Sequence, residues 1–221
     1  MSYLIRVLLP DTPGNLGQLA DAIGMVGANI QSVDIVENFA DGTVMDDIVV
    51  TLPPEVMADV LITAVDAVDG AEVDSIRPFS GRIDRRGQIA LLARVAEKAR
   101  NTTAAMEEIV DALPKALTST WAIVIDNADP AHRVAWSVAA PEDDGSTPTQ
   151  LKVDSARTLN PAEETWIPQG WTVLESALAI APVGKTGLVI AVGRAGGPDF
   201  LASEVDHLGH LGTIVGAILQ K

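Results

Sequence analysis

The sequence contains no cysteine, and this absence excludes disulfide bonds, thiolate metal ligands and cysteine nucleophiles. It also lacks any apolar run approaching the ~20 residues that a membrane-spanning helix needs. The first residues, MSYLIRVLLPDTPG, carry no basic stretch and reach proline and aspartate too early for a secretory signal. We therefore expect a soluble, cytoplasmic protein that does not associate with membranes.

Basic residues are also scarce. The chain has 15 Lys and Arg against 30 Asp and Glu, a net charge of −15. The imbalance is strongest in residues 1–80, where 13 acidic residues face only Arg6 and Arg77. Such an excess of negative charge repels a phosphate backbone, so nucleic acid is not expected as a partner.

The few basic residues gather after the acidic segment, and this basic cluster consists of Arg77, Arg82, Arg85, Arg86, Arg94, Lys98 and Arg100. One interpretation is a solvated helix face that balances the acidic domain beside it. The alternative is a docking surface for a protein partner.

The length and composition favour two domains. The chain has 221 residues, of which 48% are hydrophobic, and this is enough apolar material for two packed cores. Ser80-Gly81 marks the boundary, so we expect one domain over residues 1–80 and a second over 81–221.

The first domain alternates between the two hydrophobic periodicities. Apolar residues at strand spacing and at helix spacing predict the order βαββαβ. This order is typical of the ferredoxin-like α+β fold, with an antiparallel four-stranded sheet and two helices on one face. The strands are predicted at residues 3–9, 29–37, 44–52 and 71–79, and the helices at residues 16–26 and from Pro53-Pro54 to Val68.

The turn between the first strand and the first helix has the sequence Asp11-Thr12-Pro13-Gly14-Asn15. Proline fixes one backbone angle, glycine permits a positive one, and Asp or Asn can cap the helix that follows. The same turn can bind a ligand, because N–H groups at a helix N-terminus hold a carboxylate. Asp11 or Asn15 could then accept hydrogen bonds from an α-ammonium group.

The stretch Leu8–Ala20 resembles the signature of ACT domains, in which a strand ends in Asp-x-Pro-Gly-x-Leu and runs into a helix. Gly27-Ala28-Asn29-Ile30 resembles the next element of that signature. The resemblance implies a homodimer that binds an amino acid at its interface, near the first loop. The candidate ligand-binding residues that it implies are Asp11, Gly14, Asn15, Leu16, Asn29 and Ile30. The alternative is that Asp11 and Asn15 only cap the turn and that no ligand binds.

The second domain begins with a helical stretch over residues 83–117, broken at Asn101-Thr102-Thr103, and this break is a plausible N-cap. Residues 141–170 are rich in Pro, Asp, Thr, Ser and Asn and predict an irregular region. Strands are expected at residues 120–126, 133–139, 174–181 and 188–192, followed by a last helix over 199–220.

This second half resembles a GAF domain, most clearly from Ala179 to Gln220, where a Pro-x-Gly-x-x-Gly turn precedes a final helix. The resemblance implies an antiparallel sheet with packed helices and a ligand pocket in the irregular region. The four tryptophans, Trp121, Trp136, Trp166 and Trp171, then either pack the core or form an aromatic wall of that pocket. A covalently attached chromophore is excluded because the chain has no cysteine, and no cofactor is expected.

Three motifs that could carry chemistry have simpler interpretations. Gly184-Lys185-Thr186-Gly187 lacks the glycine that a phosphate loop requires at position 179, so a hairpin turn is expected. Glu204, His207 and His210 favour ordinary helix positions over a metal site. Asp46 and Asp47 are neighbours on a strand, so their side chains point to opposite faces and cannot serve one reaction centre.

The sequence shows no nucleophile with an evident base, no complete set of metal ligands and no dinucleotide-binding loop. We therefore expect a non-catalytic regulatory protein that binds a small ligand. The alternatives are a dimerisation or docking module that regulates a partner protein, and a second domain with an enzyme activity of its own.

Overall fold

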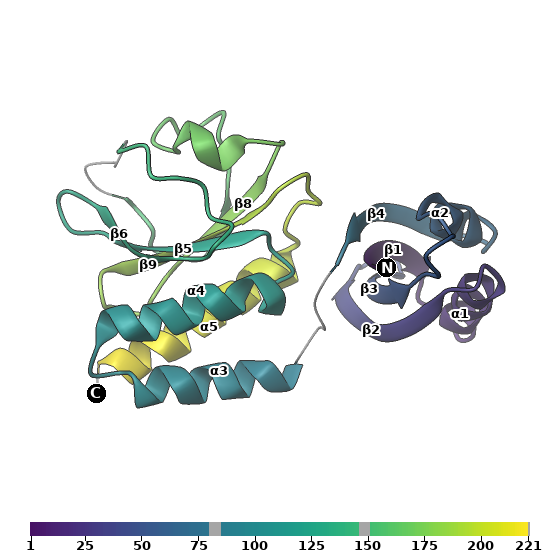
Figure 1. The fold of residues 1–221 in the computed structure, drawn as a ribbon, viewed down its shortest axis with the longest axis horizontal. Helices are drawn as coiled ribbons and strands as arrows, with labels where there is room; N and C mark the ends of the chain where they lie inside the picture. The colour runs from purple at the N-terminus through teal and green to yellow at the C-terminus, as the bar shows by residue number, and fades with distance from the viewer. Residues whose placement is uncertain (80–84, 146–150, 221) are drawn as a thin grey trace. The chain divides into compact units, whose positions relative to one another are not determined.

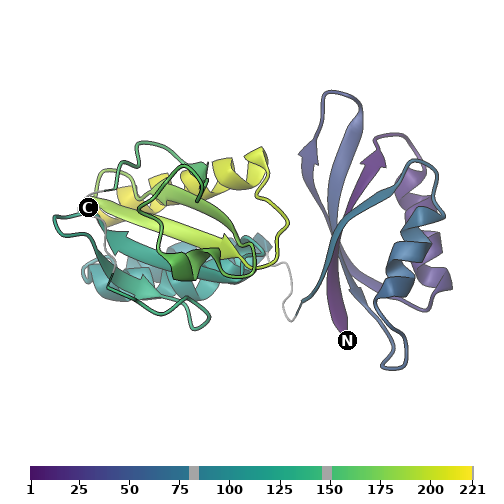
Figure 2. The same ribbon diagram turned by 90° about the horizontal axis from the view of Figure 1, so that it is seen from above.

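The computed structural model describes residues 1–79, 85–145 and 151–220. The chain divides into two compact units, a first unit at Met1–Ile83 and a second unit at Asp84–Lys221. Figures 1 and 2 show the elements of each unit from two directions.

The first unit has the predicted order βαββαβ. Its four strands form one antiparallel sheet in the order β2-β3-β1-β4. Both helices lie on the same face of this sheet (Figure 2). This is the ferredoxin-like arrangement that the sequence predicted. The elements are β1 (Ser2–Pro10), α1 (Asn15–Met25), β2 (Asn29–Asn38), β3 (Thr43–Thr51), α2 (Asp59–Asp66) and β4 (Glu72–Pro78).

The core of the first unit lies between the sheet and the two helices. Ile5 faces Ile48 across the β1–β3 ladder and Leu9 faces Val44, so these four side chains share one face. Helix α2 begins later than expected, because the segment after Pro53 first closes a separate turn in which Val56 N donates to Pro53 O.

The second unit has a five-stranded antiparallel sheet in the order β6-β5-β9-β8-β7. The three long helices lie on one side of this sheet (Figure 1). The antiparallel sheet with packed helices that the sequence predicted for this half is therefore confirmed. The elements are α3 (Arg85–Glu97), α4 (Thr102–Ala116), β5 (Trp121–Asp126), β6 (His132–Trp136), β7 (Arg157–Leu159), a 3-10 helix (Gln169–Thr172), β8 (Ala177–Pro182), β9 (Leu188–Arg194) and α5 (Ala202–Leu219).

Two details of this unit were predicted and one was missed. The side chain of Asn101 caps α4 by accepting a hydrogen bond from Ala104 N at 3.1 Å. Residues 184–187 form the tight β8–β9 turn, in which Val183 N donates to Leu188 O. Strand β7 was not predicted, because its three residues carry no alternation of their own and are held by pairing with β8.

Both faces of the second sheet are buried. Ala122 and Val124 of β5 face the helices, whereas Trp121 and Ile123 face the irregular segment on the other side. The strands β5, β8 and β9 are therefore nearly continuous apolar runs, whereas the edge strands β6 and β7 are not.

A fully buried arginine fixes one corner of the second unit. Arg194, at the end of β9, donates through Nη2 to Glu204 Oε1 at 2.6 Å and to Leu117 O at 2.9 Å. Its Nε donates to Thr118 O, and its guanidinium lies 4.1 Å from the centre of the Phe200 ring. Arg194 thus ties together the end of β9, the α4–β5 connection and the start of α5.

Glu204 is therefore used in a structural ion pair with Arg194. Among the described residues no group of three His, Cys, Asp or Glu side chains could hold a metal ion. Within the same residues, no helix is both long and apolar enough to cross a membrane.

Replacing Arg194 by Met should lower the free energy of unfolding of the second unit by about 3–5 kcal/mol, because it removes the cation that neutralises the largely buried Glu204 carboxylate. The matched control is Arg157→Met, which removes a half-exposed bidentate pair with Glu164 and should cost at most about 1 kcal/mol. Urea unfolding monitored by tryptophan fluorescence measures both, and equal losses would contradict the structural role of Arg194.

Candidate functional site

The loop that joins β1 to α1 contains four of the six candidate ligand-binding residues. Asp11 N donates to Gly42 O at 2.8 Å, which ties the loop to the β2–β3 turn. The side chain of Asn15 donates through Nδ2 to Pro10 O at 3.1 Å and closes the loop on itself. Asp11 is exposed, and the structure brings it together with Gly14, Asn15 and Leu16.

The first turn of α1 has no capping side chain. Its N-cap residue is Gly14, with φ 102°, a backbone angle that favours glycine. The expectation that Asp or Asn caps this helix is therefore wrong: Asn15 bonds back to Pro10 O, and Gly14 has no side chain to offer. Among the described residues no group accepts a hydrogen bond from the N–H of Leu16 or of Gly17. These donors remain for a ligand or water.

The other two candidates, Asn29 and Ile30, lie at the opposite end of the sheet. Asn29 pairs with Thr51 of β3, whereas the loop follows Pro10, which pairs with Thr43. The length of β3 between these positions is about 27 Å at 3.4 Å per residue. Within one chain the structure therefore does not bring Asn29 and Ile30 together with the loop, and Ile30 instead packs against the core.

Asp46 is an acidic residue beside the loop that the sequence reasoning did not count as part of a site. It lies opposite Val7 on the face of the sheet that the helices cover, and it is only 2% exposed. Its Oδ1 has no hydrogen-bond partner among the described residues. Burial raises the pKa of Asp46, and the negative charges of Asp47 and Asp11 raise it further. Asp46 and Asp11 are thus close enough to interact.

Asp47 has a different environment on the opposite face. It lies across from Arg6 in the β1–β3 ladder and accepts hydrogen bonds from Arg6 Nε at 2.7 Å and Nη2 at 2.9 Å. The prediction that Asp46 and Asp47 point to opposite faces is therefore confirmed. Arg77, the other basic residue of residues 1–79, pairs with Leu4 in the ladder and shares the face of Arg6. Neither arginine lies on the face of Asp46.

In the second unit, the sheet face away from the helices is packed by tryptophans. Trp121 and Trp171 are buried with ring centres 5.4 Å apart, and Trp166 meets Trp171 edge-on at 6.0 Å. The core interpretation therefore holds for Trp121 and Trp171. It does not hold for Trp136, which is 59% exposed on the edge strand β6.

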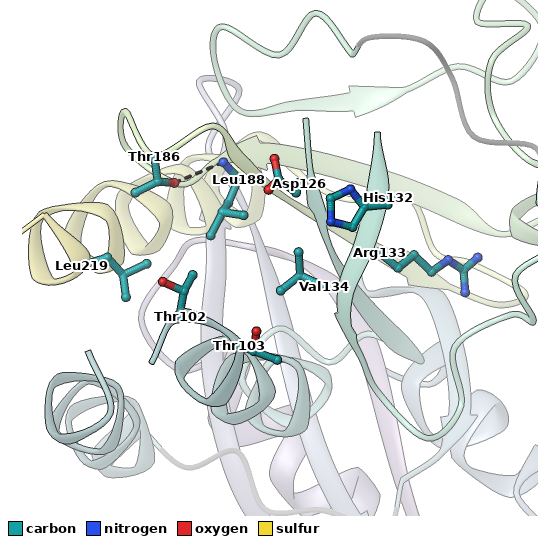
Figure 3. A pocket seen from close by; sticks show the side chains of 9 residues that line it. All are labelled: Thr102, Thr103, Asp126, His132, Arg133, Val134, Thr186, Leu188 and Leu219. Carbon is teal, nitrogen blue, oxygen red and sulfur yellow. Dashed lines mark hydrogen bonds between the residues drawn. The ribbon is translucent and has the colours of Figure 1, made fainter. Parts of the chain in front are cut away.

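The second unit also has a cavity of 580 Å³ on the side of the helices (Figure 3). Two of its polar side chains form hydrogen bonds within the unit: Arg133 donates to Pro141 O at 2.6 Å, and the hydroxyl of Thr186 donates to Val183 O and accepts from Leu188 N. This cavity therefore does not indicate a particular ligand chemistry. It is lined by Thr102, Thr103, Asp126, His132, Arg133, Val134, Thr186, Leu188 and Leu219.

Two members of the basic cluster pair within the second unit. Arg94 and Lys98 of α3 donate to the two carboxylate oxygens of Glu108 on α4, at 2.8 and 2.6 Å. Lys98 and Arg94 thereby lower the pKa of Glu108. Both basic side chains are partly exposed, in agreement with a solvated helix face. Arg82 and the side chains of Arg85 and Arg86 lie outside the described residues.

Replacing Asp46 by Asn should raise the free energy of unfolding of the first unit at neutral pH, by about 1 kcal/mol, because it removes a buried charge without a partner. A raised pKa in the folded state means that ionised Asp46 lowers stability above that pKa. The gain should therefore shrink as the pH falls toward 3.8, the ordinary value for Asp. Thermal unfolding across pH measures this. The exposed Asp21→Asn is the control and should change little, whereas a less stable Asp46→Asn variant would contradict the account.

No protein-family model and no curated protein matches the sequence. Solved structures do match. One is the GAF domain of a phosphoenolpyruvate-protein phosphotransferase from Acinetobacter, with 14% identity over 62% of this chain and 95% of that chain and a TM-score of 0.46. Another is an ACT domain protein from Streptococcus pneumoniae, with 19% identity over 35% of this chain and 88% of that chain and a TM-score of 0.29.

A third similar structure is a free methionine-R-sulfoxide reductase from Neisseria meningitidis in complex with its substrate. It has 10% identity over 65% of this chain and 95% of that chain, with a TM-score of 0.45. GAF and ACT structures are thus both among the structural neighbours of this chain.

Proposed function

We propose that this chain is a non-catalytic regulatory protein that binds an amino acid at the β1–α1 loop of its first unit. The observation that supports the proposal is the uncapped first turn of α1. The N–H groups of Leu16 and Gly17 have no acceptor among the described residues, and the exposed carboxylate of Asp11 lies in the same loop.

These groups complement the two charges of an amino acid. The N–H groups of Leu16 and Gly17 can donate to the α-carboxylate, and the positive end of the helix dipole favours the same charge. Asp11 can accept hydrogen bonds from the α-ammonium group. The side chain of Leu16, which is 43% exposed, offers an apolar surface beside them.

A homodimer would complete the site. Asn29 and Ile30 are about 27 Å from the loop along the sheet of their own chain at 3.4 Å per residue. They can contribute to binding only if they approach the loop of a second copy. In this arrangement the ligand lies between two chains, and binding shifts the equilibrium between two dimer geometries through its different affinity for each.

The proposal is tested by calorimetric titration of the full chain with each of the twenty amino acids. At least one should bind, and Asp11→Asn should weaken its binding about tenfold, because it removes a charge-assisted hydrogen bond to the ammonium group. Asp21→Asn, which removes one exposed acid of α1 outside the loop, is the matched control and should bind like the unmodified chain. If no amino acid binds, the proposed function is wrong.

A further inference from the structure

The loop site has negative charge that no basic side chain of the described residues 1–79 neutralises. Asp11 is exposed in the loop, and Asp46 is buried beside it with one oxygen unpartnered among the described residues. The only basic side chains of residues 1–79 are Arg6 and Arg77, and both lie on the other face of the sheet. The amino group of Met1 is bonded to Leu52 O, at the far end of β3.

An unpartnered buried carboxylate is costly, because folding removes its water without supplying donors. For Asp47 of the same sheet this desolvation cost is offset, because Arg6 donates two hydrogen bonds to its carboxylate and neutralises its charge. Asp46 lacks such a partner in the described part of the chain. A positively charged group from a ligand would donate hydrogen bonds to the Asp46 carboxylate and neutralise its charge, as Arg6 does for Asp47.

The depth of Asp46 indicates which part of the ligand supplies that charge. Asp46 pairs with Val7, three residues before the end of β1 at Pro10, and this corresponds to about 10 Å along the strand. The α-ammonium group stays beside the α-carboxylate at the start of α1, where Asp11 is its acceptor. A long flexible side chain with a terminal cation can extend from there toward Asp46.

We infer that the β1–α1 loop takes an amino acid with a cationic side chain, of the lysine or arginine kind, whose terminal cation pairs with Asp46. This inference rests on the proposed function. An acidic side chain would be repelled by Asp11 and Asp46. A neutral side chain of the same length would leave the Asp46 carboxylate unpaired.

The test compares L-lysine with L-norleucine, which has the same carbon chain without the terminal ammonium group, and with L-glutamate. Calorimetric titration of the full chain should show lysine or arginine binding at least about tenfold more tightly than norleucine, with no binding of glutamate. Asp46→Asn should remove this preference, and the matched control Asp21→Asn should keep it.

The outcomes separate the two proposals. If neutral amino acids bind as tightly as lysine and arginine, or if glutamate binds best, the inference is overturned and the proposed function stands. If no amino acid binds, both fail. The comparison of lysine with norleucine uses the unmodified chain, so it decides the inference even if Asp46→Asn does not fold. A folded Asp46→Asn variant that keeps the preference for lysine overturns the role of Asp46.

Discussion

Neighbouring residues on a β-strand point to opposite faces of the sheet, and this constraint gives Asp46 and Asp47 different chemistry. Asp47 meets Arg6 directly across the ladder and forms a bidentate pair, so its charge is neutralised within the sheet. Asp46 faces the helices, and neither basic side chain of the described residues 1–79 lies on that face. The scarcity of basic residues in the first eighty positions thus has a local consequence, a buried carboxylate with one oxygen unpartnered among the described residues.

The donors of the proposed site, at the start of α1, depend on Gly14. Gly14 lets the chain take a left-handed turn into α1, and because it has no side chain it leaves the first N–H groups of the helix without a cap. In α4 the side chain of Asn101 accepts a hydrogen bond from Ala104 N, which has the position in its helix that Gly17 has in α1.

The second unit is held together by contacts within itself. Trp121 and Trp171 pack one face of its sheet, and the buried Arg194 pairs with Glu204 at one corner.

Most of the fold could be predicted from the sequence, because apolar periodicity and turn residues mark nearly every element. Strand β7 was missed because it depends on pairing with β8 and carries no pattern of its own. The loop from Asp11 to Leu16 was found from its residue types. Asp46 was not, because its importance comes from burial and from the placement of Arg6 and Arg77 on the opposite face of the sheet. The separation of Asn29 from the loop likewise follows from strand register, which a single sequence does not show.

The central claim is that the exposed donors at the start of α1 hold the carboxylate of an amino acid. Backbone amide NMR of the ¹⁵N-labelled chain during titration with L-lysine and L-arginine tests it most directly. The account predicts that one of them moves the Leu16 and Gly17 resonances most, since a hydrogen bond to a carboxylate changes the environment of those N–H groups. Largest shifts in β5 or β9 of the second unit, or no shift with any of the twenty amino acids, would contradict it.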